Sequence, residues 1–524
     1  MRLSRGELAL AVGLAVWAFA PLAAVGIHVA VNGGELIGTN GYDPFDQFQY
    51  LAWIRDEGSH LFGSDLWVIG GTSHDYVQPM YLISGLLWRA GVGIQVAYLI
   101  WKPVALVVLF VGFAAYARRM TSGRRPAIAA LALALFYETP VLAFAYWTGH
   151  LSGTDRLRLA FVSDDPNSAL NLWGFEHAAI AIGLMPVFLV AVERLWAVDR
   201  AGGRSDRRWS AVAAVSGALI AWLHPWQAAE ILGVIAVVWL LSPSRRRLLV
   251  VIVPVVATVL PLAYGVLLAH YDPWWSSFQT QSTVTPPGPL WAVVASFGPL
   301  VFFALAGIRR PRGDGEWMLV LWPLAAAAAY LLLPQFPSHS LSGVTLPLAI
   351  LAVRGWQRCS ARVPVPAPVA AGLATAAVLA VTVPALVRNA DGVADDLAPN
   401  LAGALVSQEL RLTADQASAE RYLSADPRPG GVLAPWLVSM SIPGMTGRTV
   451  FAGHPQWQPH QNVPLTGEFF AAGTSGPVRR AILRGSKATF VLADCGAPPR
   501  LQAQLAPLAS LVRRFGCVTL YAIR

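Results

Sequence analysis

The segment that decides the fold is MRLSRGELALAVGLAVWAFAPLAAVGIHVAV (residues 1–31), a basic start followed by a long apolar run. A bilayer core about 30 Å thick is crossed by a helix of about 20 apolar residues. This run is too long for an ordinary signal-peptide core and lacks a clean small-x-small cleavage site. We therefore expect a retained signal-anchor helix rather than a cleaved leader.

The rest of the chain repeats this apolar pattern. The 524 residues are 55% hydrophobic and 13% charged, with a mean hydropathy of +0.52, whereas soluble domains are about a quarter charged. A shorter piece, 77–90, reads as a re-entrant or tilted outer helix. We predict an α-helical polytopic membrane protein with about 11 transmembrane helices. They lie near 7–30, 92–117, 126–147, 176–197, 209–224, 227–243, 247–270, 290–308, 317–334, 340–357 and 365–388.

The basic residues predict the orientation of these helices. The formal charge of +9 comes from arginines in short runs between apolar segments, which is the pattern of membrane topology and not of nucleic-acid binding. Basic runs fall at every second connection, and the intervening loops hold most of the acids, histidines and tryptophans. Because basic loops stay in the cytoplasm, we expect a cytoplasmic N-terminus, and everything after residue 388 outside. The basic runs are 117–125, 199–208, 242–247, 308–315 and 354–362.

The tail, 389–524, loses the hydrophobic character and predicts a small α/β extracytoplasmic domain after a transmembrane domain at 1–388. Helical patterns occur at 413–424, 477–485 and 500–512, and strand patterns at 430–438, 448–453, 488–495 and 517–523. No GxGxxG follows a strand, so a dinucleotide site is not supported. Cys495 and Cys517 could pair in an oxidising compartment, although sequence does not fix their separation.

The first outer loop, 31–76, contains GTNGYDPFDQFQYLAWIRDEGSH (38–60). Pro44 suits the first position of a helix, with Asp43 as its N-cap and Asp46 in its first turn. Both aspartates could simply cap the helix and complement its dipole. The alternative is catalytic: an amphipathic helix in the membrane interface would present Asp46 to a polar headgroup. Asp46 and Asp43 are therefore the candidate catalytic residues, and Gln49 is a candidate for substrate binding.

Ionisable residues also mark the outer ends of later spans. Glu176 and His177 begin one span, His224 ends another, and His339 precedes a third. A single histidine of this kind is usually a hydrogen-bonded structural group, but three such sites predict a shared polar cavity. Lys102 lies within a span. Its side chain either snorkels to the interface or neutralises a lipid phosphate.

Paired acids in a second outer loop raise the question of a metal. Asp164 and Asp165 precede Pro166 in FVSDDPN (161–167), where such residues commonly form a turn. With Asp43, they could instead supply hard oxygen ligands to Mg²⁺ or Mn²⁺. The sequence leaves both readings open, and no cofactor is certain.

Taken together, these features resemble the GT-C superfamily of integral membrane glycosyltransferases. The chain is also similar to a group of bacterial multi-spanning proteins in which four motifs recur. Here they read DQFQYLAWIR (46–55), GFEH (174–177), HPW (224–226) and GRTVFAGHPQW (447–457). The resemblance spans nearly the whole chain. Gly174-Phe175 replaces the Pro-Glu expected in the second motif, and the run after Gly453-His454 also departs from the pattern.

The resemblance implies an enzyme of the bacterial inner membrane that moves a sugar from a polyprenyl-phosphate donor to a glycan, lipid or protein acceptor. Asp46 would act as general base on the acceptor hydroxyl. Lys102, His177 and His224 would stabilise the departing lipid phosphate, and His454 would help to bind the acceptor. Two alternatives remain: a transporter or flippase of lipid-linked glycans, which should carry charged groups through the bilayer depth, and a non-catalytic scaffold.

Overall fold

The computed structural model describes residues 3–41, 43–200, 206–241, 244–282, 288–333, 335–362, 366–397 and 410–524. The chain divides into two compact units. Unit 1 comprises Met1–Phe19, Trp101–Leu267 and Thr283–Gly392, and unit 2 comprises Ala20–Ile100, Leu268–Ser282 and Val393–Arg524. Parts of the predicted basic connections 199–208 and 242–247, of the outer loop 271–289 and of the tail lie outside the described ranges.

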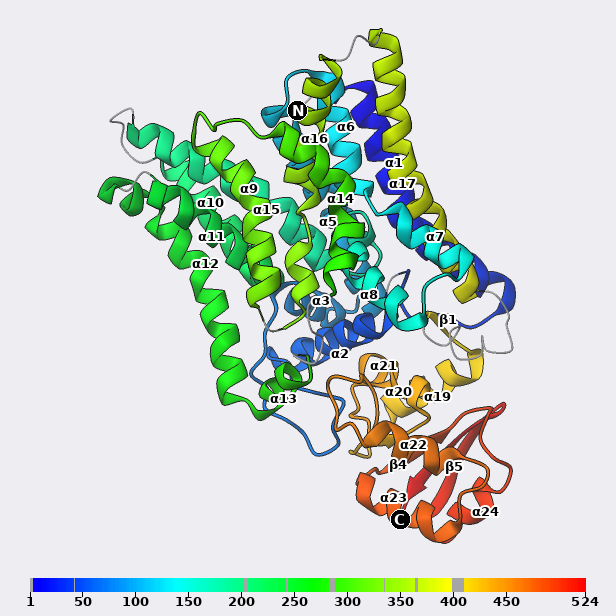
Figure 1. Ribbon diagram of the computed structural model, residues 1–524. Helices are drawn as coiled ribbons and strands as arrows, with labels where there is room; N and C mark the ends of the chain where they lie inside the picture. The colour runs from blue at the N-terminus through cyan, green and yellow to red at the C-terminus, as the bar shows by residue number, and fades with distance from the viewer. Residues whose placement is uncertain are drawn as a thin grey trace. The chain divides into compact units, whose positions relative to one another are not determined.

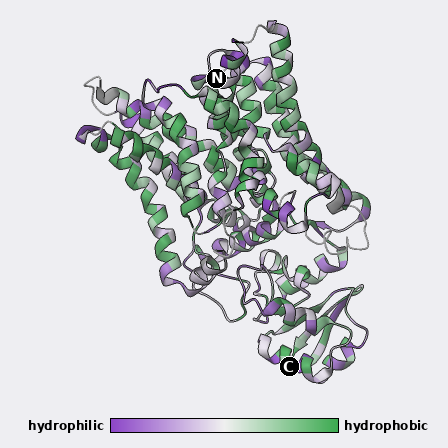
Figure 2. Ribbon diagram, in the orientation of Figure 1, coloured by the Kyte–Doolittle hydropathy of each residue, from purple (hydrophilic) through white to green (hydrophobic). Residues whose placement is uncertain are grey.

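Unit 1 is made of long helices (Figure 1), and Figure 2 shows that they are mainly hydrophobic. Helix α9 packs against both α5 and α10, and α14 packs against α16. The unit also contains the first part of α1 (Arg5–Asn32). Its other elements are α5 (Trp101–Met120), α6 (Arg124–Phe136), α7 (Pro140–Thr148), α8 (Gly153–Asp164), η1 (Leu170–Leu172), α9 (Glu176–Arg200), α10 (Arg207–Leu223), α11 (Pro225–Leu241), α12 (Arg245–Tyr271), α14 (Leu290–Gly307), α15 (Asp314–Leu332), η2 (Pro337–Leu341), α16 (Thr345–Ser360) and α17 (Ala367–Leu397).

The lengths of these helices support a multi-pass membrane protein. Within the described ranges, seven helices are long and apolar enough to cross a bilayer, and the pair α6 and α7, bent by 41° at residues 137–139, could form an eighth span. Helices also occupy the remaining predicted spans. However, α10, α11 and α16 have only 17, 17 and 16 residues. The prediction of 11 spans therefore stays a prediction.

Small residues bring two helices of unit 1 into close contact. A Cβ added at Gly307 of α14 would lie 1.9 Å from the Leu351 carbonyl oxygen of α16, and one at Gly355 would lie 1.8 Å from that of Phe303. Both helices therefore need glycine where they cross. Backbone contact through small residues is a common way for helices to associate in membranes.

In unit 2, α2 (Pro44–His60) begins at Pro44, as predicted. Asp43 occupies the N-cap position, but with φ 42° and no side-chain hydrogen bond to the helix. The prediction of an amphipathic helix in the membrane interface is wrong, because α2 is buried on both faces: Phe48 is 1% exposed and Glu57 is 0% exposed. It packs against α3 (Pro79–Arg89), α4 (Ile94–Leu99) and α21 (Ile442–Thr446).

The C-terminal part of unit 2 contains a four-stranded sheet with the order β3-β4-β6-β5. Strands β3 (Val432–Leu433) and β4 (Phe490–Ala493) are parallel, and β6 (Val518–Ile523) is antiparallel to β4 and to β5 (Ala509–Phe515). One core includes Leu433, Phe469, Val491 and Tyr521. A small α/β domain is thus present. The remaining elements of unit 2 are β1 (Glu35–Leu36), α13 (Pro273–Ser282), β2 (Arg411–Leu412), α19 (Ala414–Ala425), α20 (Trp436–Ser439), α22 (Asn462–Phe470), α23 (Gly476–Ser486) and α24 (Leu501–Leu505).

Three expectations for the tail need correction. The strand predicted at 430–438 is limited to Val432–Leu433, and Trp436–Ser439 form helix α20. The helix predicted at 500–512 ends at Leu505, and the chain then forms strand β5. The strand predicted at 448–453 is reduced to one parallel bridge between Val450 and Val432. Cys495 and Cys517 form a disulfide with a Cα–Cα distance of 4.9 Å, so the structure settles the pairing that the sequence left open.

Candidate active site

The first and last of the four sequence motifs pack against each other in unit 2. The Arg55 guanidinium at the end of the first motif donates to the Met445 carbonyl oxygen, 3.0 Å away. A Cβ at Gly447 would lie 2.9 Å from Arg55 Nε, and one at Gly444 would lie 2.8 Å from Leu51 Cβ. These contacts bring the segment that follows, 447–457, against α2.

Asp46 of α2 forms a hydrogen bond with His454. The His454 Nε2 and Asp46 Oδ1 atoms are 3.0 Å apart, and the two side chains are 4% and 34% exposed, respectively. The Gln456 backbone N–H donates to His454 Nδ1 at 3.3 Å. That donor leaves the ring proton on Nε2, from which it is donated to the carboxylate. A nearly buried histidine therefore holds a carboxylate that solvent still reaches.

Gln49 and Trp67 pack next to the hydrogen-bonded pair of Asp46 and His454. The Trp67 indole N–H donates to the Gln49 side-chain oxygen. A Cβ at Gly453 would lie 2.0 Å from the Trp67 ring, so the backbone beside His454 can rest on the ring only because residue 453 is glycine. Gln49 is 2% exposed. Its observed contact is with the protein, and its predicted role in substrate binding stays a prediction.

Beside this pair, unit 2 has a small pocket lined by aromatic rings and acids. Trp457 follows His454 by three residues, and its ring lies 5.3 Å from that of Trp53 and 4.7 Å from that of Trp275, nearly perpendicular to both. Tyr76 packs against Trp53 and Trp275 at 4.5 and 4.6 Å. The pocket is lined by Trp53, Ser64, Asp65, Thr72, Ser73, Asp75, Asp272, Trp274, Trp275 and Trp457.

Two of the acids that line the pocket, Asp65 and Asp75, have raised pKa values. Burial, with the nearby Asp272 carboxylate, raises the pKa of Asp65 to about 8, although the Trp67 backbone N–H opposes the shift. Burial and Asp272 also raise the pKa of Asp75. The Asp272 carboxylate itself caps α13 by accepting the backbone N–H groups of Trp274 and Trp275, both at 2.8 Å. At pH 7, Asp65 is therefore mainly a neutral acid that can donate a hydrogen bond.

The structure brings the three predicted histidines of unit 1 together. The His224 ring lies 6.2 Å from that of His177 and 5.5 Å from that of His339, although they come from three separate segments. Gln227 links the group, because its side-chain nitrogen donates to the His339 carbonyl oxygen at 2.8 Å and its oxygen contacts His224 Nδ1. Trp226 packs edge-on against His339 at 4.8 Å. What this group binds stays a prediction.

Lys102 and Glu176, two further candidates, form an ion pair in unit 1. The Lys102 ammonium and the Glu176 carboxylate are 2.9 Å apart, and both side chains are 0% exposed. Lys102 also donates to the Leu172 carbonyl oxygen. A fully buried ammonium does not snorkel, so that reading is wrong. The observed contacts tie α5 to the start of α9.

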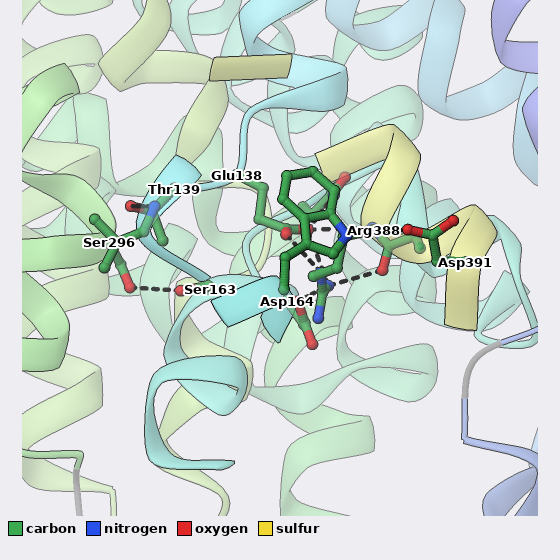
Figure 3. Close-up of polar contacts among 11 residues, drawn as sticks. Glu138, Thr139, Ser163, Asp164, Ser296, Arg388 and Asp391 are labelled. Carbon is green, nitrogen blue, oxygen red and sulfur yellow. Dashed lines mark hydrogen bonds and ion pairs between the residues drawn. The ribbon is translucent and has the colours of Figure 1, made fainter. Parts of the chain in front are cut away.

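Asp164, a candidate metal ligand, lies in a second buried charge cluster of unit 1, shown in Figure 3. Arg388 Nη2 lies 2.6 Å from Asp164 Oδ1, and Arg388 Nε lies 3.0 Å from Glu138 Oε1. Asp165 follows as the C-cap of α8, and its carbonyl oxygen accepts from the Ser342 hydroxyl at 3.0 Å. A guanidinium already neutralises Asp164, which does not suit a divalent cation on the same carboxylate. The metal-binding roles expected of Asp165 and Asp43 stay predictions.

The sequence reading did not select several of these residues. It missed the pocket acids Asp65 and Asp272, the ring of Trp275, and the pair of Glu138 and Arg388. One signal was present: DPWW (272–275) places an acid and two tryptophans in a predicted outer loop. Such a sequence suits a polar site better than a plain connector.

Comparisons with known proteins give only distant similarity. No protein-family model and no curated protein sequence matches the chain. Among solved structures, it is similar to ArnT from Cupriavidus metallidurans bound to undecaprenyl phosphate, with a TM-score of 0.49, 15% identity, and coverage of 99% of this chain and 98% of that chain. For ArnT in the apo state, these values are 0.44, 16%, 91% and 93%. For the archaeal oligosaccharyltransferase AglB from Archaeoglobus fulgidus, in complex with an inhibitory peptide and a dolichol-phosphate, they are 0.44, 15%, 96% and 72%. Similarity at this level assigns neither substrate nor catalytic residues.

Proposed function

We propose that this chain is a membrane glycosyltransferase that moves a sugar from a polyprenyl-phosphate donor to an acceptor at the outer face of a bacterial inner membrane. The observation that carries the proposal is the hydrogen bond between Asp46 and His454, which joins two motifs separated by 408 residues. A carboxylate that is oriented by a buried donor and still reached by solvent suits a general base.

The proposed step is an inverting displacement. The acceptor hydroxyl oxygen bonds to the anomeric carbon while the bond from that carbon to the phosphate oxygen breaks. The hydroxyl proton passes to the Asp46 carboxylate, and the electron pair leaves with the lipid phosphate. That phosphate is a good leaving group and needs no strong acid. His454 acts as a positioning residue that keeps one carboxylate oxygen fixed.

The aromatic pocket supports a saccharide as the group that is bound. Pockets for small molecules commonly combine aromatic walls with a few placed polar groups. Here the rings of Trp53, Trp275 and Trp457 supply flat apolar surface, and the neutral acid of Asp65 supplies a hydrogen-bond donor to a sugar hydroxyl. Trp53 is two helical turns beyond Asp46 on α2, and Trp457 is three residues beyond His454.

For the donor phosphate we propose the histidine group of His177, His224 and His339. Imidazoles can donate hydrogen bonds to an anion without a permanent charge. Lys102 is less suited than the sequence suggested, because its ammonium already neutralises Glu176. His224→Ala should therefore raise the KM for the lipid donor more than it lowers kcat.

The base assignment is tested with Asp46→Asn in isolated membranes. Polyprenyl-phosphate sugars of several kinds are supplied, and release of polyprenyl phosphate and formation of a glycosylated product are followed by mass spectrometry. We expect a loss of about 10²–10⁴-fold, the usual contribution of a general base. Asp155→Asn is the matched control, because Asp155 is 41% exposed and pairs only with its helical neighbour Arg158 among the described ion pairs.

Two outcomes would overturn the proposal. Undiminished transfer by a folded Asp46→Asn protein would remove the base. Movement of a lipid-linked glycan across reconstituted liposomes, without any new covalent product, would instead favour a flippase.

A further inference from the structure

A separate group of metal-ligating side chains lies at the end of α2. Asp56 and His60 are one helical turn apart, and His74 comes from the segment 61–78 that joins α2 to α3. Asp56 Oδ1 is 2.9 Å from His60 Nδ1 and 3.4 Å from His74 Nε2. One oxygen and two imidazole nitrogens, all within 4.8 Å of one another, therefore face a common point.

Two of the three distances between these atoms fit a tetrahedral transition-metal ion, and the third, between the two imidazole nitrogens, is at most 4.8 Å. Zinc binds imidazole nitrogen and carboxylate oxygen at about 2.0–2.2 Å, so adjacent ligand atoms in a tetrahedron lie about 3.4 Å apart. The two distances from Asp56 Oδ1 lie at or below this value. Little movement is needed to admit an ion.

The carboxylate is held in the orientation that such a site requires. Asp56 Oδ2 accepts both the backbone N–H of Ser64, at 2.6 Å, and its hydroxyl, at 2.8 Å. These donors fix the carboxylate and leave Oδ1 directed at the two rings. Hydrogen bonds from a second layer of residues are a regular feature of metal sites.

Burial and charge separate this arrangement from an ordinary ion pair. Asp56 is 5% exposed, whereas His60 and His74 are 54% and 42% exposed, so an ion can enter from solvent and keep a water as fourth ligand. The two imidazole rings are only 4.2 Å apart. A divalent ion binds imidazole rings in their neutral form, so one ion can hold both of these neighbouring rings.

We propose that Asp56, His60 and His74 bind one divalent transition-metal ion, with zinc preferred because the ligands are two imidazoles and one carboxylate. The ion ties the end of α2 to segment 61–78, which carries the pocket residues Asp65 and Asp75. Its role is structural. The site is independent of the proposed sugar transfer, and either can fail without the other.

The test uses the full-length protein, purified in detergent with a tag that contains no histidine and stripped with a chelator. Zinc chloride is titrated by calorimetry, and bound metal is counted by elemental analysis. We expect one zinc per chain, at least tenfold weaker binding in His60→Ala and in His74→Ala, and about tenfold weaker binding in Ser64→Ala. His460→Ala, which removes an exposed histidine of the same unit, should bind like the wild type.

Two further measurements, cobalt absorption and proteolysis, test the metal site even if one of the variants folds poorly. Cobalt in place of zinc should give the visible absorption of a tetrahedral ion in the wild type and in His460→Ala, but not in His74→Asn. Zinc should also slow proteolysis within segment 61–78. A wild-type protein that binds no zinc, or His60→Ala and His74→Ala proteins that bind it unchanged, would overturn the proposal.

Discussion

Buried acids at two places in unit 1 face cations, whereas two buried acids in unit 2 do not. In unit 1, Glu176 lies against Lys102, and Glu138 and Asp164 lie on either side of Arg388. In unit 2, Asp65 and Glu420 each have one carboxylate oxygen without a hydrogen-bond partner among the described residues, and burial raises the pKa of both to about 8.

The presence or absence of a cation changes what a buried acid does in the protein. A buried carboxylate that faces a cation is paired by it, and removal of either partner leaves an uncompensated charge. A buried carboxylate without a cation keeps its proton instead. Glu176 and Glu138 therefore tie segments of unit 1 together, whereas Asp65 and Glu420 of unit 2 are held as neutral donors that a ligand or a pH change can alter.

The largest effect should come from breaking the pair in unit 1. Lys102→Met leaves the Glu176 carboxylate buried at 0% exposure without its cation. We expect a loss of about 3–5 kcal/mol in the free energy of unfolding, which is the usual cost of one broken buried pair. Thermal and denaturant unfolding of the purified protein in detergent would measure it.

The double variant Lys102→Met/Glu176→Met is the control. Replacing both partners by apolar residues is often nearly neutral, so most of the lost stability should return. If the single and double variants were equally unstable, the ion pair with Glu176 would not explain the contribution of Lys102 to stability. A loss of packing by the lysine stem would then explain the result better.

A smaller effect, of opposite sign, should follow from Asp65→Asn. The pKa of Asp65 is raised to about 8 in the folded protein, against about 3.9 in the unfolded chain. Its contribution to stability is fully present below about pH 4 and is lost as the pH rises to about 8. The amide cannot ionise, so the variant should gain stability relative to the wild type as the pH rises from about 4 to about 8, with little difference between the two proteins at pH 4.

Unfolding midpoints of both proteins between pH 4 and pH 9 would check this expectation. Parallel curves would mean that Asp65 does not titrate in this range.

Local chemistry explains which parts of this architecture the sequence could predict. Pro44 has a fixed φ and suits a first helical position, so the start of α2 was correctly predicted. Ionisable residues at apolar helix ends need a polar neighbour, which is why His177, His224 and His339 could be expected together.

Long-range pairings could not be predicted in this way. Arg388 meets Glu138 across 250 residues, and no local spacing connects them. The segment AQLAPLASLV (503–512) carries apolar residues that fit a helix. From residue 509, however, it forms strand β5, which pairs with β6 across the hairpin at Gly516. Short apolar runs leave helix and strand unresolved, and tertiary pairing decides between them.

The smallest change in the free energy of unfolding should come from Glu420→Gln. Comparing it with Glu176→Gln tests directly whether a neighbouring cation matters to a buried acid. Glu420 is 2% exposed and accepts a hydrogen bond from the Ser441 hydroxyl at 2.6 Å, and burial raises its pKa from 4.5 to about 8. At pH 4.5 it is neutral in the folded protein and only half ionised in the unfolded chain, so the amide should change the free energy of unfolding by less than about 1 kcal/mol there. Relative to the wild type, the variant should gain stability as the pH rises from about 4.5 to about 8, and no further above that. Glu176→Gln makes the same chemical change where the acid faces Lys102, and it should cost several kcal/mol because the ammonium loses its counter-charge. Unfolding of both variants at pH 4.5 decides the matter: equal losses would mean that the cation beside Glu176 makes no difference to the cost of replacing a buried acid.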